Sequence, residues 1–155
     1  MKIKILWPGK TKNKNLKSLE EYYLEKINFL IPCQVIEVKE EKGIKEKFKE
    51  KIKEKESKRL EKYFQDNYII CLTERGEEMT SSQFAEFIKR LLVTSQKDII
   101  FVIGGFAGLA ENVLNRANSL LSLSKMTFTH ELSRIILLEQ IYRALSTIRG
   151  YKYAK

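Results

Sequence analysis

The sequence predicts an α/β protein of one domain, in which a parallel sheet is flanked by helices. Segments with strand and helix patterns alternate along all 155 residues, which is the order typical of parallel sheets. Two of the strands, residues 68–72 and 99–103, are continuous apolar runs, as expected for strands buried on both faces. The sequence contains no linker, internal repeat or compositional break, so we expect residues 1–155 to form a single domain.

The N-terminal segment has the pattern of a strand, a turn and a helix. Residues 2–7 alternate polar and apolar side chains and stop at Pro8-Gly9, which indicates a strand with a turn behind it. Apolar residues then recur every three or four positions from Leu16 to Leu30. This spacing predicts a helix that ends before Pro32.

The next segment is a short strand followed by a highly charged helix. We expect the strand over residues 34–38 and the helix over residues 40–62. An apolar stripe along this helix indicates that it packs on the sheet, so its charges favour a solvated face over a binding site. The stripe consists of Ile44, Phe48, Ile52, Leu60 and Phe64.

The rest of the chain continues the alternation of strands and helices. The helix after strand 68–72 is expected to open at Thr80, because Thr80 and Gln83 have the spacing of a capping box. The remaining expected elements are strand 99–103, helix 111–117, strand 120–126 and helix 131–149.

The composition points to an acidic partner. The formal net charge is +9 and lysine dominates over arginine, which favours association with nucleic acid. A lysine-rich surface that only keeps the protein soluble is the alternative.

Cys33 and Cys71 lie in apolar strand-like runs without metal-ligand spacing, and are expected to be reduced core thiols. The chain has no signal-peptide pattern and no apolar run of the ~18 residues that a membrane span needs, so we expect a cytoplasmic protein.

Two turns at the ends of consecutive strands are candidates for a ligand crevice. Gly104-Gly105-x-x-Gly108 directly follows strand 99–103, and adjacent glycines allow close approach of a ligand to the backbone. It lacks the spacing of dinucleotide and phosphate loops. In Leu121-Ser122-Leu123-Ser124 the alternation would place both serines on one side of the strand. Each motif alone is also compatible with a plain turn; together they favour a small-ligand site.

The last helix combines an apolar circumference with polar residues near the candidate turns. Arg134 begins the stripe that continues through Leu138, Ile141, Leu145 and Ile148, so its guanidinium must reach solvent, pair with an acid or contact a ligand. Because the helix is apolar nearly all round, the pattern suggests a subunit interface.

His130 is the single histidine of the chain, and either a structural or a site role fits its position. The sequence has no Ser-His-Asp set, no cluster of metal ligands and no carboxylate pair that would indicate hydrolysis.

Three motifs together carry a family resemblance. They are Ile103-Gly104-Gly105-x-x-Gly108-Leu109, Leu121-Ser122-x-Ser124-Lys125-Met126-Thr127-Phe128-x-His130, and Arg134-x4-Glu139-Gln140-x-Tyr142-Arg143-Ala144. In this combination the chain resembles the ribosomal RNA large subunit methyltransferase H family, which are small SPOUT-class enzymes. The resemblance implies an S-adenosylmethionine-dependent enzyme that methylates N3 of a pseudouridine in large-subunit ribosomal RNA. It also implies a homodimer with a SPOUT-type α/β knot, in which the C-terminal part is threaded as a trefoil knot.

The resemblance further implies site residues and the form of the substrate. The implied cofactor-binding positions are Leu72, Gly104, Gly105, Gly108, Leu123, Ser124, Lys125, Met126, Thr127 and Phe128. The implied substrate or catalytic candidates are His130, Arg134, Tyr142, Arg143 and Tyr153. No metal is implied. Because so small a protein offers little area for specificity, we expect the substrate to be ribosomal RNA in the assembled ribosome or subunit. Phosphate contacts are expected from Lys10, Lys12, Lys14, Arg149, Lys152 and Lys155.

One departure from similar proteins lies in the tail. They usually end in Tyr-His followed by a basic residue, whereas this chain ends in Tyr153-Ala154-Lys155 and has no imidazole there. Two other functions fit the same sequence: a non-catalytic ribosome- or RNA-binding protein that has kept the fold, and a SPOUT methylase of another RNA, for example at a ribose oxygen.

Overall fold

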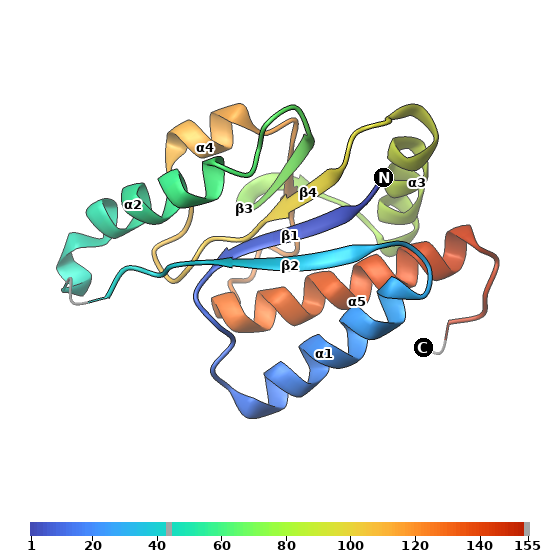
Figure 1. Cartoon of the computed structure of the whole chain (residues 1–155), viewed down its shortest axis with the longest axis horizontal. Coiled ribbons are helices and arrows are strands. Elements are labelled where there is room, and N and C mark those ends of the chain that lie inside the picture. Colours follow the sequence, from blue (N-terminus) through green and yellow to red (C-terminus); the bar gives the residue numbers. More distant parts are fainter. Residues whose placement is uncertain (43–44, 154–155) are drawn as a thin grey trace.

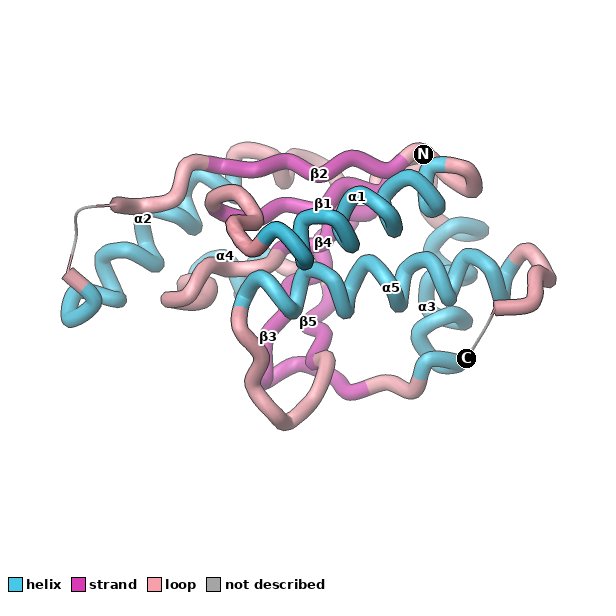
Figure 2. Tube along the Cα trace, turned by 90° about the horizontal axis from the view of Figure 1, so that it is seen from below, coloured by secondary structure: helices cyan, strands magenta, loops and turns pink. Residues whose placement is uncertain are grey.

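The computed structural model describes residues 1–42 and 45–153 and confirms the α/β fold. In this part of the chain, five parallel strands form one sheet in the order β2-β1-β4-β3-β5 (Figure 1; β5 is labelled in Figure 2). The strands are β1 (Ile3–Pro8), β2 (Cys33–Val38), β3 (Tyr68–Glu78), β4 (Ile99–Val102) and β5 (Ser119–Ser122). The helices are α1 (Lys14–Asn28), α2 (Lys49–Glu61), α3 (Ser81–Thr94), α4 (Glu111–Arg116) and α5 (His130–Ile148), and a 3-10 turn, η1 (Glu46–Phe48), precedes α2.

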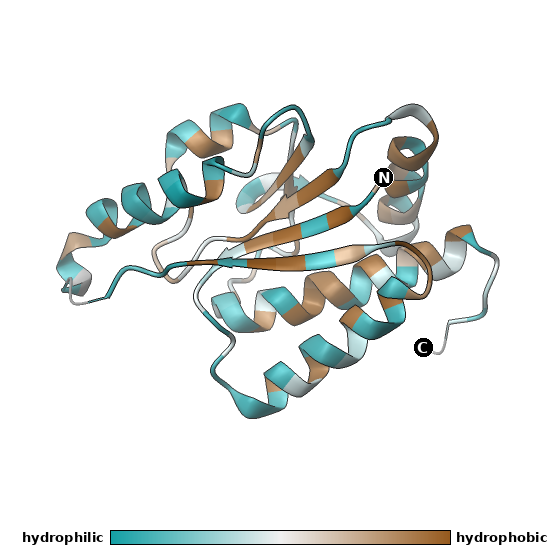
Figure 3. Cartoon of the chain, in the orientation of Figure 1, coloured by the Kyte–Doolittle hydropathy of each residue, from teal (hydrophilic) through white to brown (hydrophobic). Residues whose placement is uncertain are grey.

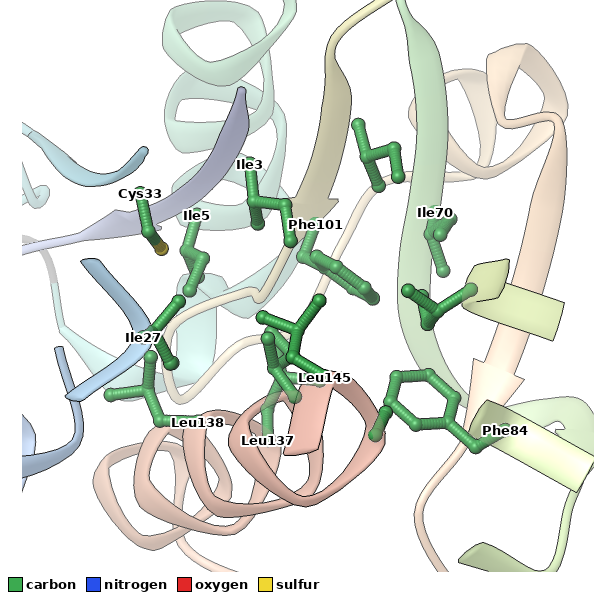
Figure 4. Close-up of a cluster of buried hydrophobic side chains, with 14 of the residues drawn as sticks. Ile3, Ile5, Ile27, Cys33, Ile70, Phe84, Phe101, Leu137, Leu138 and Leu145 are labelled. Carbon is green, nitrogen blue, oxygen red and sulfur yellow. The ribbon is translucent and has the colours of Figure 1, made fainter. Parts of the chain in front are cut away.

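The helices cover both faces of the sheet. Helices α2 and α4 lie on one face, and α1, α3 and α5 lie on the other, where Figure 2 shows α1 and α5 side by side. The apolar residues are concentrated on the strands, whereas α2 is largely hydrophilic (Figure 3). The larger core packs β1, β3 and β4 against α1, α3 and α5 (Figure 4). The sheet is therefore buried on both faces, as its apolar strands predict.

Side-chain caps define where the longer helices begin. The Asn13 carboxamide oxygen accepts from the backbone N–H groups of Asn15 and Leu16 at the start of α1. The capping box at α3 is confirmed, because Thr80 and Gln83 each accept from the other's backbone N–H. These caps satisfy N–H groups that a helix leaves without intrahelical partners.

The predicted bounds of strand 120–126 and helix 40–62 are wrong. The strand predicted over 120–126 ends at Ser122, whose hydroxyl donates to the Ser124 carbonyl oxygen, and the Ser124 hydroxyl in turn accepts from Met126 N–H. These local bonds replace the ladder and turn the chain out of the sheet, so the two serines do not share a strand face. The helix predicted over 40–62 begins only at Lys49.

The apolar stripe predicted for the α2 region is partly correct. Ile52, Leu60 and Phe64 are buried, whereas Phe48 is about half exposed. Ile44 lies outside the described residues. The buried members hold the C-terminal half of α2 on the sheet, while its N-terminal end projects from it.

The apolar circumference of α5 is used within one chain. Leu137, Leu138, Ile141 and Leu145 are almost fully buried, because α5 packs against the sheet, α1 and α3 together. A helix enclosed on three sides needs apolar residues at most angles. The pattern that suggested a subunit interface is therefore explained by packing inside the chain.

Strand β3 is longer than predicted and is interrupted by a bulge. Leu121 of β5 is registered with both Leu72 and Glu77, so residues 73–76 leave the ladder between these two pairings. Gly76 allows this crossing, because a Cβ atom there would lie 2.6 Å from the backbone nitrogen of Leu121. The bulge carries residues 73–75 to the carboxyl edge of the sheet.

The trefoil knot implied by the resemblance stays a prediction. Among residues 1–42 and 45–153, no helix has the length and apolar character needed to cross a membrane. The same residues contain no group of three or more histidine, cysteine or acidic side chains that could hold a metal ion.

Candidate functional site

A pocket of about 570 Å³ opens at the carboxyl edge of the sheet, between the ends of β3, β4 and β5 and the first turn of α5. This volume lies in the range of small-molecule and cofactor sites. The lining residues come from four segments: Leu72, Thr73, Glu74 and Arg75; Ile103, Gly104, Gly105, Phe106, Gly108, Leu109 and Leu114; Ser122, Leu123, Ser124, Met126, Thr127, Phe128 and Thr129; and His130 and Ser133.

Nine of the ten expected cofactor positions line this pocket. They are Leu72, Gly104, Gly105, Gly108, Leu123, Ser124, Met126, Thr127 and Phe128. Lys125 belongs to the same loop but is exposed and is not part of the lining. Segments far apart in the sequence therefore meet at one place, as predicted for turns at the carboxyl ends of parallel strands.

The glycine turn forms one wall of the pocket. Gly108 N–H donates to the Gly105 carbonyl oxygen at 3.0 Å, and Gly108 has a positive φ of 83° that favours glycine. A Cβ atom on Gly104 would lie 2.6 Å from the carbonyl carbon of Gly108. The turn can close this tightly only because position 104 has no side chain.

Two buried polar residues of α2 support the glycine turn from behind. The Ser57 hydroxyl accepts from the backbone N–H of Ala110 at 2.9 Å. Glu56 is buried beside Gly105, where a Cβ atom would lie 2.9 Å from Oε1 of the carboxyl group. Burial raises the pKa of Glu56, and its other oxygen accepts from Glu41 N–H. The α2 sequence, which predicts a solvated face, gives no sign of these two contacts.

His130 lies on the pocket wall at the start of α5. Partial burial lowers the pKa of its imidazole below the ordinary value, and the nearby charge of Arg134 lowers the pKa further. The imidazole is therefore neutral near pH 7 and has one nitrogen that can accept a hydrogen bond or a proton.

Arg134 does not face the pocket. Its guanidinium is fully buried and donates to the Pro8 carbonyl oxygen at 2.7 Å and to the Thr11 hydroxyl at 3.0 Å. It also lies over the Trp7 ring, 4.6 Å from the centroid, which gives a cation–π contact. Of the roles open to it, the structure shows a buried link between the first turn of α5 and the loop after β1.

The same first turn makes a second contact with this loop. The Glu131 carboxylate accepts from the backbone N–H groups of Lys12 and Asn13, both at 3.1 Å. The loop that contains Lys12 is therefore held next to the pocket by two neighbouring side chains of α5.

The other three catalytic candidates gather at the far end of α5. Tyr153 and Tyr142 meet edge to face with ring centroids 5.2 Å apart, and the Arg143 guanidinium lies 4.4 Å from the Tyr153 centroid. Glu139 pairs with Arg143 and accepts from the Tyr153 hydroxyl. Burial and the Glu139 charge raise the pKa of Tyr153, so its phenol stays protonated. Ala154 and Lys155 lie outside the described residues.

This C-terminal cluster is remote from the pocket within one chain. Tyr142 lies twelve positions after His130 on α5, which corresponds to about 18 Å along the helix axis. The structure therefore divides the expected catalytic residues into one in the pocket (His130), one buried against the loop after β1 (Arg134) and three at the other end of α5.

The sequence-based prediction missed part of the pocket. The bulge residues Thr73, Glu74 and Arg75 and the turn residue Phe106 line it. An isolated glycine after an apolar strand, as in Gly76, is the sequence signal that could have indicated the bulge.

The lining suits a ligand with an apolar ring and a polar end. Leu72, Ile103, Leu109, Leu114 and Leu123 supply apolar surface, and hydroxyls of the 122–129 loop together with backbone groups of the two turns supply polar partners. S-adenosylmethionine, with an adenine and an amino-acid end, has this character.

Comparison with known proteins gives consistent matches over the full length. The family model described as predicted SPOUT methyltransferase matches residues 1–154. A protein of Malacoplasma penetrans named ribosomal RNA large subunit methyltransferase H is 43% identical over 158 residues, covering 100% of both chains. The protein of the same name from Geobacter metallireducens is 39% identical over 154 residues, covering 99% of this chain and 98% of that protein.

Solved structures agree with the fold. A probable methyltransferase from Bordetella pertussis aligns with a TM-score of 0.59 at 12% identity, covering 92% of this chain and 95% of that one. A probable methylase family protein from Haemophilus influenzae aligns with a TM-score of 0.57 at 14% identity, covering 99% and 70%. On the strength of the family model and the full-length relatives, this chain belongs to the SPOUT methyltransferase family and, within it, to the ribosomal RNA large subunit methyltransferase H family.

Proposed function

We propose that this chain methylates N3 of a pseudouridine in large-subunit ribosomal RNA, acting on the assembled ribosome or subunit in the cytoplasm. The observation that carries the proposal is the pocket itself, since nine of the ten cofactor positions implied by the family resemblance line one cavity. The names of the full-length relatives agree with this activity. The net charge of +9 suits a substrate made of RNA.

As a SPOUT methyltransferase, the chain uses S-adenosylmethionine. The sulfonium of this cofactor supplies an activated methyl group, so the protein mainly has to align the acceptor and exclude water. In our assignment the glycine turn and the 122–129 loop hold the cofactor through backbone groups and hydroxyls. Leu72 and Leu123 supply apolar walls.

We assign His130 to the acceptor side of the pocket. N3 of pseudouridine carries an imide proton that must leave before or during methyl transfer. The neutral imidazole of His130 can accept this proton or a hydrogen bond from it. The tail of this chain has no histidine that could take the role. Arg134 acts on the site only indirectly in this assignment, through the position of the first turn of α5 and through its charge.

The distance between the two groups of candidates supports a homodimer. One pyrimidine cannot contact both His130 and the cluster of Tyr142, Arg143 and Tyr153, which lies about 18 Å farther along α5. A second copy of the chain could bring its cluster to this pocket. Sedimentation equilibrium at micromolar concentration should therefore give about twice the monomer mass.

Mixing two inactive variants tests this shared site. Gly104→Val should disable the pocket, and Arg143→Ala should disable the cluster. After exchange of subunits, some dimers would contain one intact pocket facing one intact cluster, and methylation should return. Absence of recovery in mixtures that have exchanged subunits would show that each chain acts with its own cluster only.

The function is tested by mapping methylation on ribosomal RNA. Mass spectrometry of RNA from cells with and without the gene should show one methylpseudouridine that depends on the gene. Purified protein should restore it on ribosomes or subunits with S-adenosylmethionine. Cofactor binding without any methylation would favour a non-catalytic RNA-binding protein, and a methyl group at a ribose oxygen would indicate a different SPOUT specificity.

A further inference from the structure

Two exposed phenylalanine rings lie on the glycine turn and at the start of α2. Phe106, on the glycine turn, lines the pocket and has 46% of its surface exposed. Phe48, just before α2, has 48% exposed. Neither ring belongs to the two buried apolar clusters of the described chain. Packing within the chain therefore does not account for these two rings.

Each of these rings has a lysine ammonium close to it. Lys49 Nζ lies 6.0 Å from the Phe106 centroid, and Lys47 Nζ lies 5.2 Å from the Phe48 centroid. Lys49 follows Phe48 directly in the chain, so the two ring–lysine pairs are linked through consecutive residues at the start of α2. We call these four residues the aromatic–cationic surface; its Phe106 end lines the pocket.

This surface is held in place relative to the pocket. Ser57 of α2 binds the backbone N–H of Ala110, and Glu56 lies against Gly105, the residue before Phe106. Helix α2 and the glycine turn, which carry the surface, are thus coupled by buried contacts. An aromatic ring on a supported turn loses little conformational freedom when a ligand stacks on it.

We propose that Phe106 and Lys49, continued by Phe48 and Lys47, form a stacking site for the unpaired RNA bases next to the methylated nucleotide. Single-stranded RNA is commonly bound by aromatic faces that stack on bases and by cations that follow the phosphates. The surface has both elements. The proposal rests on the proposed function, and it deepens it by naming the chemical class of the neighbouring substrate: unpaired nucleotides rather than a duplex.

The test compares Phe106→Ala with Phe106→Tyr. Loss of one stacking platform should raise the KM for ribosomal substrate about tenfold, at saturating S-adenosylmethionine. The affinity for the cofactor, measured by calorimetry, should change less than twofold. Tyrosine keeps the aromatic face, so Phe106→Tyr should restore a KM near that of wild type. The matched control is Phe29→Ala, because Phe29 is 84% exposed and precedes β2 at the opposite edge of the sheet.

Lys49→Ala tests the cationic half of the surface. It should raise the KM and reduce the salt dependence of RNA binding, whereas Lys89→Ala on the exposed side of α3 should do neither. A Phe106→Ala variant with weaker cofactor binding and an unchanged KM for RNA would show that the ring is only a cofactor wall. Loss of the dimer in sedimentation would identify the surface as a contact between subunits. A Phe106→Ala variant whose KM for RNA, cofactor affinity and dimer are all unchanged would also overturn the proposal.

A second measurement separates this proposal from the proposed function. Binding of a fluorescein-labelled single-stranded oligoribonucleotide reports on the surface without methyl transfer. If wild-type protein binds the oligonucleotide and Phe106→Ala binds about tenfold more weakly, the stacking site stands even where no methylation is found. If wild-type protein methylates ribosomes but both proteins bind and turn over equally, the stacking site fails and the function stands.

Discussion

Replacing Gly104 by alanine should open the glycine turn and weaken cofactor binding. The added methyl group would meet three backbone atoms of Gly108, at 2.6, 2.8 and 2.9 Å. Ordinary contact begins at 3.4 Å, so the two strands of the turn would have to separate by about 0.8 Å. Backbone atoms cannot rotate away as the end of a side chain can. The obstacle is therefore the closure of the turn itself rather than a side chain projecting toward the ligand.

The structure allows the size of this effect to be estimated. Relief of such overpacking typically costs about 1–3 kcal/mol. A displacement of the turn moves Gly104, Gly105 and Gly108, all of which line the pocket. If about 1.4–2.8 kcal/mol of this overpacking energy is lost from the free energy of cofactor binding, the Kd for S-adenosylmethionine rises roughly 10- to 100-fold. Isothermal titration calorimetry measures the Kd, and urea unfolding of the same samples measures the loss of stability.

Gly105 offers a matched comparison one residue away. A methyl group there would meet only Oε1 of the Glu56 carboxyl group at 2.9 Å, which a small rotation of that side chain can relieve. Gly105→Ala should therefore weaken binding much less, and the double variant Gly105→Ala/Glu56→Ala should relieve the contact. Equal effects of alanine at positions 104 and 105 would refute the argument from backbone closure.

Three further predictions follow from buried or partly buried groups. Arg134→Ala should destabilise the fold by about 2–5 kcal/mol in urea unfolding, because it leaves a cavity and an unpaired carbonyl. The control Arg90→Ala, on the exposed side of α3, should change the stability little. An Arg134→Ala variant of normal stability that has lost turnover would instead show that the arginine is catalytic. Folding lowers the pKa of His130, so the unfolded chain binds more protons below about pH 6.5 and the free energy of unfolding falls as the pH falls through that range. The fall between pH 7 and pH 5 should be shallower for His130→Gln. Identical stability profiles of the two proteins would contradict a lowered pKa of His130. Burial raises the pKa of Cys33 and Cys71 to about 12. Neither thiol should therefore react with a thiol reagent at pH 8 until the protein is unfolded. Rapid labelling of the native protein would show that one of the two strands opens.

The sequence predicted the order of elements and most of the pocket because both depend on local patterns. Apolar runs, a capping box and a glycine turn are determined by a few neighbouring residues. The strand predicted over residues 120–126 was too long, because the alternation of leucine and serine resembles a strand. The Ser122 hydroxyl instead bonds within its own turn, and the strand ends there. The apolar circumference of α5 does not by itself distinguish a subunit interface from packing inside one chain, because one chain can enclose a helix on three sides.

The roles of Arg134, Glu56 and Ser57 could not be read from their positions in the sequence. Each is a polar residue on a helix, and its partner lies about 50 to 126 residues away or in a separate turn. Only the packed structure decides whether such a side chain faces solvent, a ligand or a buried carbonyl. Arg134 binds the buried carbonyl oxygen of Pro8. Ser57 binds the backbone N–H of Ala110, the N-cap residue of α4.

The contacts of α5 with the loop after β1 also determine the order in which the protein can be completed during synthesis. Arg134 and Glu131 bind residues 8–13, more than 115 positions earlier in the chain. The apolar face of β1 that α5 covers, including Ile3 and Ile5, stays open until that helix has been made. A growing chain would therefore expose that strand face and lack the part of the pocket lining that His130 and Ser133 supply until its final helix docks. Exposed apolar surface of this kind makes an incomplete chain prone to aggregation.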